Sequence, residues 1–525
     1  MAAIAIQREH VRPSPGSLPR LFAPGRQQVG LIIPPSAFLL DERVFVSLGV
    51  LKIASSLEAA GHAVNVLDLS GIKNYVEALD AYLADSPDAV IGITATTPQL
   101  PAVFEIARAI RRRRPDIRLI LGGPHVTLTV AARKLEMKLD RPRGRAAQAL
   151  AQLEGMFDAL VAGDGEVAVL HAIRPDAPLL IDGDDNKGSF FMNDAMFDAS
   201  PWPARHLVDM SSYRYSIEGH GATSLIAQLG CPFNCGFCGG RNSKSLRVIR
   251  TRTTQSIVAE MEHIHRTYGH TGFMFYDDEL NVSKSVVELM HAITDLQMRL
   301  GVEFRLRGFM KAELFTEAQA VAMHGAGFRW LLCGFEAANP RILTNIEKRA
   351  TLADNHRAVA TAKRHGLKVK ALMSIGHPGE SEESALDVRN WLIEAGVDDF
   401  DCSIITTYPG TPYYDLAVPH ASLAGVWTYT HPRTGDRLHA CDVDFSRTPD
   451  YYKGDPDGGY KAYVFTDHVS STELVRLRDL IERDVRQVLN IPFNPSRAAL
   501  RFEHSMGQGL PGFILRSSDA VKTCD

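Results

Sequence analysis

The stretch CPFNCGFCGG, residues 231–240, concentrates three cysteines, Cys231, Cys235 and Cys238, in a segment that also carries proline and glycine. Thiolates at this spacing could ligate zinc or an iron–sulfur cluster, or could be incidental. A structural zinc site normally takes four protein ligands, and no second close pair of Cys or His follows. A 4Fe–4S cluster usually takes four thiolates, so three leave one iron open for chemistry. The spacing therefore favours a 4Fe–4S cluster over the other two interpretations.

The bulk composition is that of an ordinary globular protein. The chain has 525 residues, enough for two or three domains, with 45% hydrophobic and 22% charged residues. A formal net charge of −4 predicts no nucleic-acid surface, and no apolar run reaches the length of a membrane span. Seven cysteines do not resemble a secreted disulfide framework, so a reducing cytoplasmic location is expected. Residues 1–27 lack the apolar core of a secretory signal and are predicted to be a flexible tail.

Residues 28–175 alternate between apolar strand patterns and helical patterns. The predicted strands are 28–35, 63–71, 88–97, 117–125 and 157–166. Strands that alternate with helices predict a doubly wound, Rossmann-like parallel sheet, with ligands at the carboxyl ends of its strands. Glycines gather at those ends.

A second alternating series follows a predicted linker at 176–217. Strands are expected at 224–230, 272–279, 303–309, 330–336, 368–376 and 399–408, within a domain of residues 218–418. Six such units predict a partial (β/α)6, TIM-like barrel with its chemistry at the carboxyl-end loops. Residues 419–525 are predicted to be a small α/β extension, with a hairpin and then a helix over 470–489 that begins with a capping box.

The cysteine motif CPFNCGFC resembles the signature of radical S-adenosylmethionine (SAM) enzymes. In that family the amino and carboxylate groups of SAM chelate the open iron, and reduction of the cluster cleaves SAM to a 5′-deoxyadenosyl radical. The resemblance implies that Phe237, the aromatic residue before the last cysteine, lies against the adenine.

Later segments resemble the strand ends of the same family, in the same order. They are FYDDELN (275–281), RLRG (305–308), GFEAANPRILTNIEK (334–348), IGHPGES (375–381) and TTYPGTPYYD (406–415). The resemblance implies that Asp277, Arg307 and Glu336 contact SAM. An apolar strand leads up to Glu336, so this carboxylate is expected to have a partner.

The first sheet resembles the cobalamin-binding domain fused to one large group of radical SAM enzymes. The segments that carry this resemblance include DAVIGITATT, IRLILGGPH and FDALVAGDGE. The residues expected to contact cobalamin are Thr94, Thr96, Thr97, Gly122, Gly123, Pro124 and Gly163. The histidine motif Asp-x-His-x-x-Gly is absent, and neither His62 nor His125 has its context. Cobalamin is therefore expected to bind without a histidine ligand to cobalt.

These resemblances imply a methyltransferase that moves a methyl group from SAM, via methylcobalamin, to an unactivated carbon of a small metabolite. The alternative keeps both cofactors but catalyses ring closure, rearrangement or ring contraction. A non-catalytic sensor is disfavoured because it needs no open iron. A methylthiotransferase is disfavoured because residues 1–230 contain no cysteine for a second cluster. The expected partners are a small-molecule substrate and an external electron donor of the flavodoxin or ferredoxin type.

Overall fold

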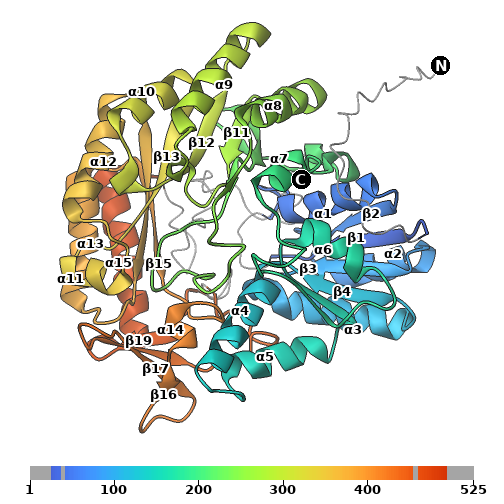
Figure 1. Ribbon diagram of the computed structural model, residues 1–525. Coiled ribbons are helices and arrows are strands. Elements are labelled where there is room, and N and C mark those ends of the chain that lie inside the picture. Colours follow the sequence, from blue (N-terminus) through green and yellow to red (C-terminus); the bar gives the residue numbers. More distant parts are fainter. Residues whose placement is uncertain (1–24, 37–41, 453–458, 493–525) are drawn as a thin grey trace, which may run out of the picture.

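The computed structural model describes residues 25–36, 42–452 and 459–492, so most of the predicted tail lies outside the described residues. Two α/β units lie side by side, and a small antiparallel sheet adjoins them (Figure 1). Among the described residues, no helix has both the length and the apolar character needed to cross a lipid bilayer.

The first unit is a six-stranded parallel sheet in the order β2-β1-β3-β4-β5-β6. Its strands are β1 (Gln28–Ile33), β2 (Ala63–Asp68), β3 (Val90–Thr94), β4 (Arg118–Gly122), β5 (Ala159–Gly163) and β6 (Leu180–Gly183). Its helices are α1 (Leu48–Ala59), α2 (Tyr75–Asp85), α3 (Leu100–Arg113), α4 (Pro124–Lys138), α5 (Arg145–Glu154) and α6 (Gly165–Ala172). Apolar residues of α1 and α6 cover one face, and those of α3, α4 and α5 cover the other, as a doubly wound sheet requires.

The stretch predicted as a linker takes part in this sheet. Strand β6 pairs in parallel with β5, and α7 (Asp194–Ala199) follows it. The prediction of a linker over 176–217 was therefore wrong for residues 180–183. Strand β6 has only four residues and ends in glycine, so its alternation of apolar and polar residues is too short to predict a strand.

The second unit is a curled sheet in the order β15-β14-β13-β12-β11-β8-β7. Its strands are β7 (Ser216–Ile217), β8 (His220–Leu225), β11 (Gly272–Phe275), β12 (Arg305–Met310), β13 (Phe328–Glu336), β14 (Lys368–Ile375) and β15 (Asp399–Ile404). All except β7 run parallel, so the predicted partial barrel of six parallel strands is confirmed. The first barrel strand begins at His220, four residues before the predicted start.

Helices line the outer face of the barrel sheet. They are α8 (Thr254–Tyr268), α9 (Val286–Leu300), α10 (Glu317–Gly325), α11 (Pro340–Ile346), α12 (Leu352–Arg364) and α13 (Glu382–Ala395). Outward side chains such as Phe273, Leu331 and Val369 pack beneath these helices, so their neighbours in sequence point to the inward, concave face. The ribbon shows the first domain beside this open side of the barrel (Figure 1).

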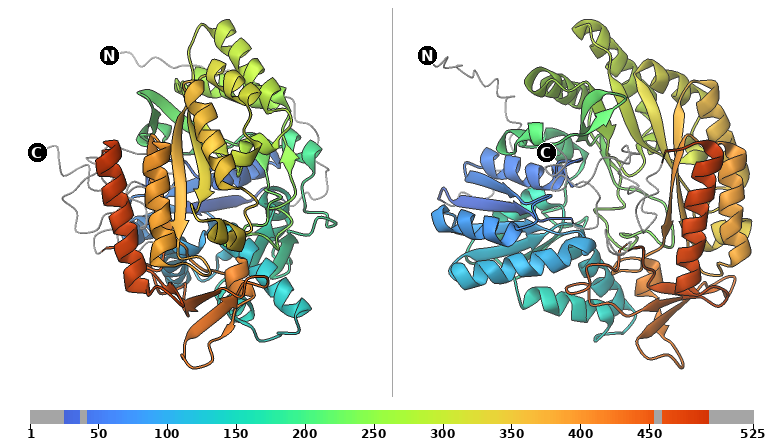
Figure 2. Two further views of the ribbon diagram at one scale, coloured as in Figure 1. Left: turned by 90° about the vertical axis from the view of Figure 1, so that its left-hand side faces the viewer. Right: turned by 180° about the vertical axis from the view of Figure 1, so that it is seen from behind.

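The extension forms a four-stranded antiparallel sheet and one long helix, as its pattern predicted. These elements are β16 (Val418–Pro419), β17 (Val426–Thr430), β18 (Arg437–Cys441), β19 (Val464–Thr466) and α15 (Ser471–Leu489). The predicted capping box at Ser470 and Glu473 is present at the start of α15. Figure 2 shows α15, in red, next to α13 at the end of the barrel sheet.

Helix α15 seals the free edge of β15, which an incomplete barrel would otherwise leave unpaired. Glu482 accepts the amide proton of Cys402 at 2.8 Å, and Arg478 donates to the carbonyl of the same residue at 3.2 Å. Arg486 donates to the carbonyl of Phe400 at 2.8 Å. Side chains thus satisfy the backbone groups that would otherwise invite another strand.

Candidate active site

The cysteine loop is fixed to the barrel through its backbone. Cys231 donates its amide proton to the carbonyl of Leu246 at 3.0 Å, and Gly236 donates to the carbonyl of Ile346 at 2.7 Å. A Cβ atom at Gly236 would lie 2.7 Å from the ring of Tyr413, so only glycine fits against this ring. The loop therefore has a defined path after the first barrel strand.

The three thiols lie near one another in a recess. Burial raises the pKa of Cys231 to about 11 and also raises the pKa of Cys235 and of Cys238, and the neighbouring Cys235 and Cys231 raise that of Cys238 further. Cys238 is nonetheless exposed to solvent, so the recess is open at this sulfur. Within the described ranges, no three Cys, His, Asp or Glu side chains converge on one metal-ion position. A cubic cluster binds each thiolate at a different iron, so three neighbouring thiols that share no single metal-ion position fit this donor set.

The half-buried Glu336 has a charged partner, as expected from the sequence. Lys348, itself buried, places Nζ 3.4 Å from Glu336 Oε1, and Ser374 Oγ donates to Glu336 Oε2 at 3.0 Å. The side chain folds back over Gly334, where a Cβ atom would lie 2.6 Å from Glu336 Oε1. Although burial lowers the pKa of Lys348, Glu336 and the neighbouring Cys235 raise it above its usual value.

The backbone at Glu336 departs from regular strand geometry. Its φ is +67°, a value that non-glycine residues rarely adopt, and the pairing of β13 with β14 shifts register between Gly334 and Glu336. Such a conformation costs about 1–3 kcal/mol and persists where its surroundings enforce it. Burial and, after it, the nearby Glu336 carboxylate raise the pKa of the Cys235 thiol, so the strand end places this carboxylate near the cysteine loop.

Asp277 is already occupied by the protein backbone. It is buried, and its carboxylate accepts amide protons from Ala227, at 3.1 Å, and Gln228. Burial raises the pKa of Asp277 to about 7. The neighbouring Glu279 differs, because its Oε2 atom is buried without a hydrogen-bond partner among the described residues, and burial raises its pKa to about 7 as well. Sequence reasoning singled out Asp277, but Glu279 offers the more available oxygen.

Arg307 and Phe237 occupy different parts of the site. Arg307 lies on the inward face of β12, buried, with its guanidinium carbon 5.7 Å from the ring centroid of Trp330. Phe237 packs edge-on against His377, with 5.4 Å between ring centroids. His377 in turn is hydrogen-bonded through Nε2 to Ser374 Oγ at 2.8 Å, so it supports the group that holds Glu336.

The threonines predicted to contact cobalamin do not share one environment. Thr97 is buried and is hydrogen-bonded to His125 Nδ1 at 3.0 Å. Thr96 begins the short helix η1 (Thr97–Gln99) and forms a capping box with Gln99. Thr94 ends β3 and is half-buried. The fold itself thus uses Thr96 and Thr97 in local hydrogen bonds, and of the three threonines only Thr97 is fully buried.

The glycines at the strand ends are required by close backbone approach. Gly123 has φ +95° and ψ −176°, a region essentially limited to glycine, and a Cβ atom there would lie 2.5 Å from Thr94 Oγ1. At Gly163, with φ +78°, a Cβ atom would collide with the backbone of Gly183. Gly122 meets no such constraint. Pro124 is the first residue of α4, where a missing amide proton costs nothing.

Neither histidine considered as a cobalt ligand is available for that role. Both ring nitrogens of His125 are hydrogen-bonded, to Thr97 Oγ1 at 3.0 Å and to Thr129 Oγ1 at 3.3 Å. Burial lowers the pKa of His125 to about 3, so the ring is neutral. His62 precedes β2 and therefore lies at the opposite end of the sheet from the carboxyl ends of the strands.

Two aspartates join the first domain to the segment that follows the cysteines. Asp184 Oδ1 accepts from Ser245 N at 2.8 Å and from the hydroxyls of Ser243 and Ser245. Asp164 pairs with the buried Arg250. Asp164 directly follows β5 and Asp184 directly follows β6, so the carboxyl ends of the first sheet hold residues 243–250, the segment that follows the cysteine loop. Sequence analysis missed them, although the signal was present in an acidic residue directly after each glycine-ended strand.

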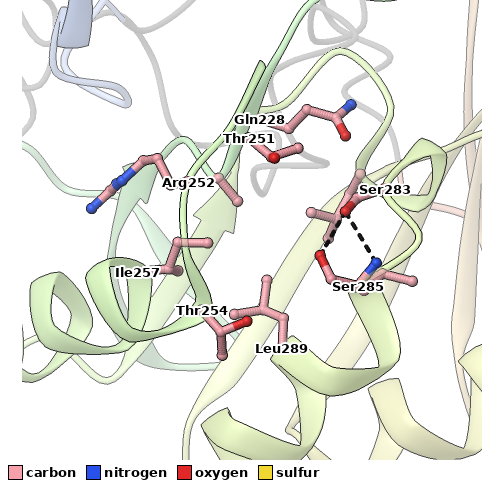
Figure 3. Close-up of a pocket in the computed structure, with 11 residues that line it drawn as sticks. Gln228, Thr251, Arg252, Thr254, Ile257, Ser283, Ser285 and Leu289 are labelled. Atoms are coloured by element: carbon pink, nitrogen blue, oxygen red, sulfur yellow. Dashed lines mark hydrogen bonds between the residues drawn. The ribbon is translucent and has the colours of Figure 1, made fainter. Parts of the chain in front are cut away.

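A small hollow in the barrel lies apart from these groups. Figure 3 shows it between α8, α9 and the segment near Gln228, with Ser283 and Ser285 hydrogen-bonded to each other at 2.9 Å. Its lining combines serine, threonine and apolar residues with Gln228 and Arg252, and it contains none of the three cysteines.

Comparisons with known proteins agree with this arrangement. Residues 225–392 match the radical SAM superfamily, and residues 42–154 match the B12 binding domain. An uncharacterized methyltransferase of Pyrococcus horikoshii is 27% identical over 414 residues, which cover 74% of this chain and 82% of that protein. The hopanoid C-3 methylase of Methylococcus capsulatus is 23% identical, over 71% of this chain and 69% of the methylase.

One solved structure has nearly the same extent. The radical S-adenosylmethionine methyltransferase TsrM from Kitasatospora setae, with cobalamin and a 4Fe–4S cluster bound, aligns with a TM-score of 0.62 at 18% identity. The alignment covers 87% of this chain and 91% of that one, and it confirms the fold class. The two domain matches show a radical SAM enzyme that carries a B12-binding domain and is related to methyltransferases.

Proposed function

We propose that this enzyme is a cobalamin-dependent C-methyltransferase, which moves a methyl group from SAM, by way of cobalamin, to an unactivated carbon of a small metabolite. The observation that supports the proposal is the attachment of residues 243–250, which follow the cysteine loop, to the carboxyl ends of β5 and β6 through Asp164 and Asp184. In parallel α/β sheets these ends bind ligands, so the attachment brings the two cofactor regions together. Both of the curated relatives described above are named as methyltransferases or methylases.

The side chains of the barrel are chemically suited to a 4Fe–4S cluster and to SAM. Cys231, Cys235 and Cys238 would bind a 4Fe–4S cluster, which with SAM supplies radical chemistry. Glu336, held by Lys348 and Ser374, presents a fixed carboxylate to the amino group or ribose of SAM. Phe237 provides the apolar surface for adenine, and Arg307 is a further proposed SAM contact. Glu279 takes the place first expected for Asp277, because the backbone amides of residues 227–228 already occupy the Asp277 carboxylate.

In the first domain, Thr94 and the glycine-rich ends at Gly122, Gly123 and Gly163 would form the floor beneath cobalamin, beside Pro124, Thr96 and Thr97. No histidine ligand to cobalt is proposed, because both nitrogens of His125 are engaged. Electron paramagnetic resonance of the cob(II)alamin form should show no nitrogen superhyperfine splitting. A splitting that disappears in His125→Ala or His62→Ala would contradict this part of the proposal.

The proposal includes a cytoplasmic location and an external electron donor of the flavodoxin or ferredoxin type. Its test is anaerobic reconstitution with iron, sulfide and cobalamin, followed by incubation of a metabolite pool with methyl-deuterated SAM. A product that carries the deuterated methyl group supports the methyltransferase. A consumed substrate whose product lacks the label would contradict it and would favour ring closure or rearrangement.

A further inference from the structure

Lys311 is a buried lysine that has no part in the proposed SAM contacts or in the proposed cobalamin floor. It directly follows β12, and its side chain is 1% exposed. Two hydrogen bonds to Asn281 fix its backbone, because Lys311 N donates to Asn281 Oδ1 at 2.8 Å and Asn281 Nδ2 donates to the Lys311 carbonyl at 2.9 Å. A lysine is almost never fully buried unless other groups compensate for its lost hydration, so its surroundings are informative.

The ammonium group of Lys311 lies against the cysteine loop. Lys311 Nζ is 4.1 Å from the ring centroid of Phe233, which stands two residues from both Cys231 and Cys235. An ammonium group over an aromatic ring makes an attractive contact, and this attraction is stronger where water is excluded. The cation is therefore held beside the segment that carries the first two thiols.

The counter-ion of Lys311 is Glu313, in the short helix η5 (Ala312–Leu314). Glu313 Oε1 lies 2.5 Å from Lys311 Nζ. Burial raises the pKa of the Cys235 thiol, and Lys348 and Lys311 are the charged groups that oppose this rise most strongly. The leading carboxylates that act on this thiol are Glu336 and Glu279, not Glu313. The ammonium group of Lys311 thus lies nearer to the loop than its counter-ion does.

Lys311 belongs to a connected set of charged side chains next to the loop. Its Nζ donates to the carbonyl of Lys348 at 3.4 Å, which links the Lys311–Glu313 pair to the Lys348–Glu336 pair. The fifth member is Glu279, whose pKa burial raises to about 7, so this carboxylate is only partly charged at neutral pH. Within this set, the two ammonium groups are the ones that favour additional negative charge at the loop.

We propose that Lys311 raises the reduction potential of the 4Fe–4S cluster bound by the three cysteines. The inference rests on the proposed function, since it needs that cluster. One electron from a low-potential one-electron donor makes the cluster and its thiolates more negative by one unit, and no bond forms or breaks at Lys311. A nearby buried cation stabilises this reduced form, because a buried charge is screened much less than an exposed one. Lys311 acts through the field at the loop and is therefore a positioning residue.

The test is a reductive titration of the reconstituted holoenzyme with dithionite, without SAM, followed by the low-temperature electron paramagnetic resonance signal of the reduced cluster. In Lys311→Met the ratio of reduced to oxidised cluster at a fixed potential should fall about tenfold, which lowers the midpoint potential by about 59 mV for one electron. Lys311→Met/Glu313→Gln leaves no unpaired buried charge and should lower the midpoint by a smaller amount, because the nearer charge is the cation. A wild-type midpoint potential in both variants would overturn the inference.

The sign of the shift separates an electrostatic effect from a distorted loop. Glu313→Gln keeps the cation and removes its counter-ion, so the midpoint potential should rise. A fall in Glu313→Gln as well as in Lys311→Met would show that the loop is disturbed, and it would contradict the proposed role of the charge.

Lys368→Met/Glu218→Gln is the matched control. Lys368 Nζ lies 2.7 Å from Glu218 Oε1 and 5.2 Å from the ring centroid of Trp330, so it also combines a carboxylate with an aromatic ring. It begins β14, whose eight residues put it roughly 20 Å from the carboxyl end of the strand. The midpoint potential of this control should equal that of the wild type. A shift as large as that of Lys311→Met would show that the effect does not depend on proximity to the loop, and would overturn the inference.

Iron and cobalamin are measured on every sample, which also shows whether each variant is folded. If iron loads in every variant and the midpoint potential never changes, the inference about Lys311 fails and the proposed function stands. If the wild-type chain takes up no iron, the cluster itself is refuted, and the proposed function fails together with the inference.

Discussion

The carboxyl ends of the strands carry different kinds of residue in the two domains. In the first domain, Thr97, His125 and Gly123 are neutral, and hydrogen bonds and close backbone packing already occupy them. In the barrel, the half-buried Glu336 and the buried Lys348 bring opposite charges to the corresponding position. The strand ends of the first domain therefore offer a ligand a close-fitting backbone surface, whereas those of the barrel offer charged side chains.

This difference matches the chemistry of the proposed ligands. A large macrocycle can be bound mainly by a complementary surface, which glycines provide because they let backbone approach closely. A zwitterionic ligand needs charged partners whose own desolvation is already compensated. The comparison predicts that substitutions will act through different physical causes in the two domains.

The largest effect is expected at the cysteines. Replacing Cys231, Cys235 and Cys238 together with alanine should abolish iron binding, because no thiolate remains in the loop. Cobalamin binding should persist, since the first domain folds around its own core. Iron analysis and the visible spectrum measure both results. Tight zinc at one per chain in the wild type, with no iron after reconstitution, would refute the cluster assignment.

The next effect concerns the buried charge pair. Glu336→Gln leaves Lys348 without its main counter-charge, which should lower the free energy of unfolding by about 3–5 kcal/mol. Urea denaturation of the protein measures this change. Glu317→Gln is the control, because its ion pair with Arg364 is exposed and its loss should not be measurable. Equal stability of the two variants would show that the charge pair contributes nothing to the fold.

A smaller effect separates two adjacent glycines of the first domain. Gly123→Ala should destabilise the protein by about 3 kcal/mol, since alanine must adopt a glycine-only conformation and crowd Thr94. At Gly122 the nearest atom lies 3.8 Å from a Cβ position, so Gly122→Ala should be almost neutral. Thermal unfolding measures the difference between the two variants. Similar melting temperatures would contradict the argument from backbone geometry.

The smallest effect is a pH dependence at His125. The native pKa of about 3 lies below the ordinary value of 6.5, so protons bind preferentially to the unfolded chain. The stability is therefore complete above pH 6.5 and is lost as the pH falls, by about 1.4 kcal/mol at pH 5.5. His125→Gln should remove this part of the slope. Asp277 has the opposite sign, because its raised pKa makes stability fall as the pH rises from about 4 to 7. A variant with the wild-type slope would show that His125 does not titrate as its burial requires.

Features that depend on hydrophobic periodicity, and on the order of motifs along the chain, could be predicted from the sequence. The six barrel strands, the cysteine loop and the need for a partner at Glu336 all follow from apolar patterns and local chemistry. The identity of that partner could not be predicted, because Lys348 is brought to Glu336 only by the turn after α11.

Contacts between distant segments were also invisible in the sequence. Asp277 and Glu279 look alike in the sequence, and only the fold shows which of them the backbone of residues 227–228 occupies. The extension carries no chemical motif, yet Arg478, Glu482 and Arg486 recur every four residues on one face of α15 and seal the barrel edge. Charged residues at helical spacing on a buried face were the available signal.

The central claim is that the cofactor sites at the carboxyl ends of the strands in the two domains act together on one substrate molecule. Its most direct test is the ratio of by-products that the reconstituted enzyme forms from methyl-deuterated SAM during turnover. The account predicts S-adenosylhomocysteine and 5′-deoxyadenosine in near-equal amounts, together with one labelled methyl group in each product molecule. If 5′-deoxyadenosine forms without S-adenosylhomocysteine and no label reaches the product, the two sites do not cooperate in methyl transfer, and the account is wrong.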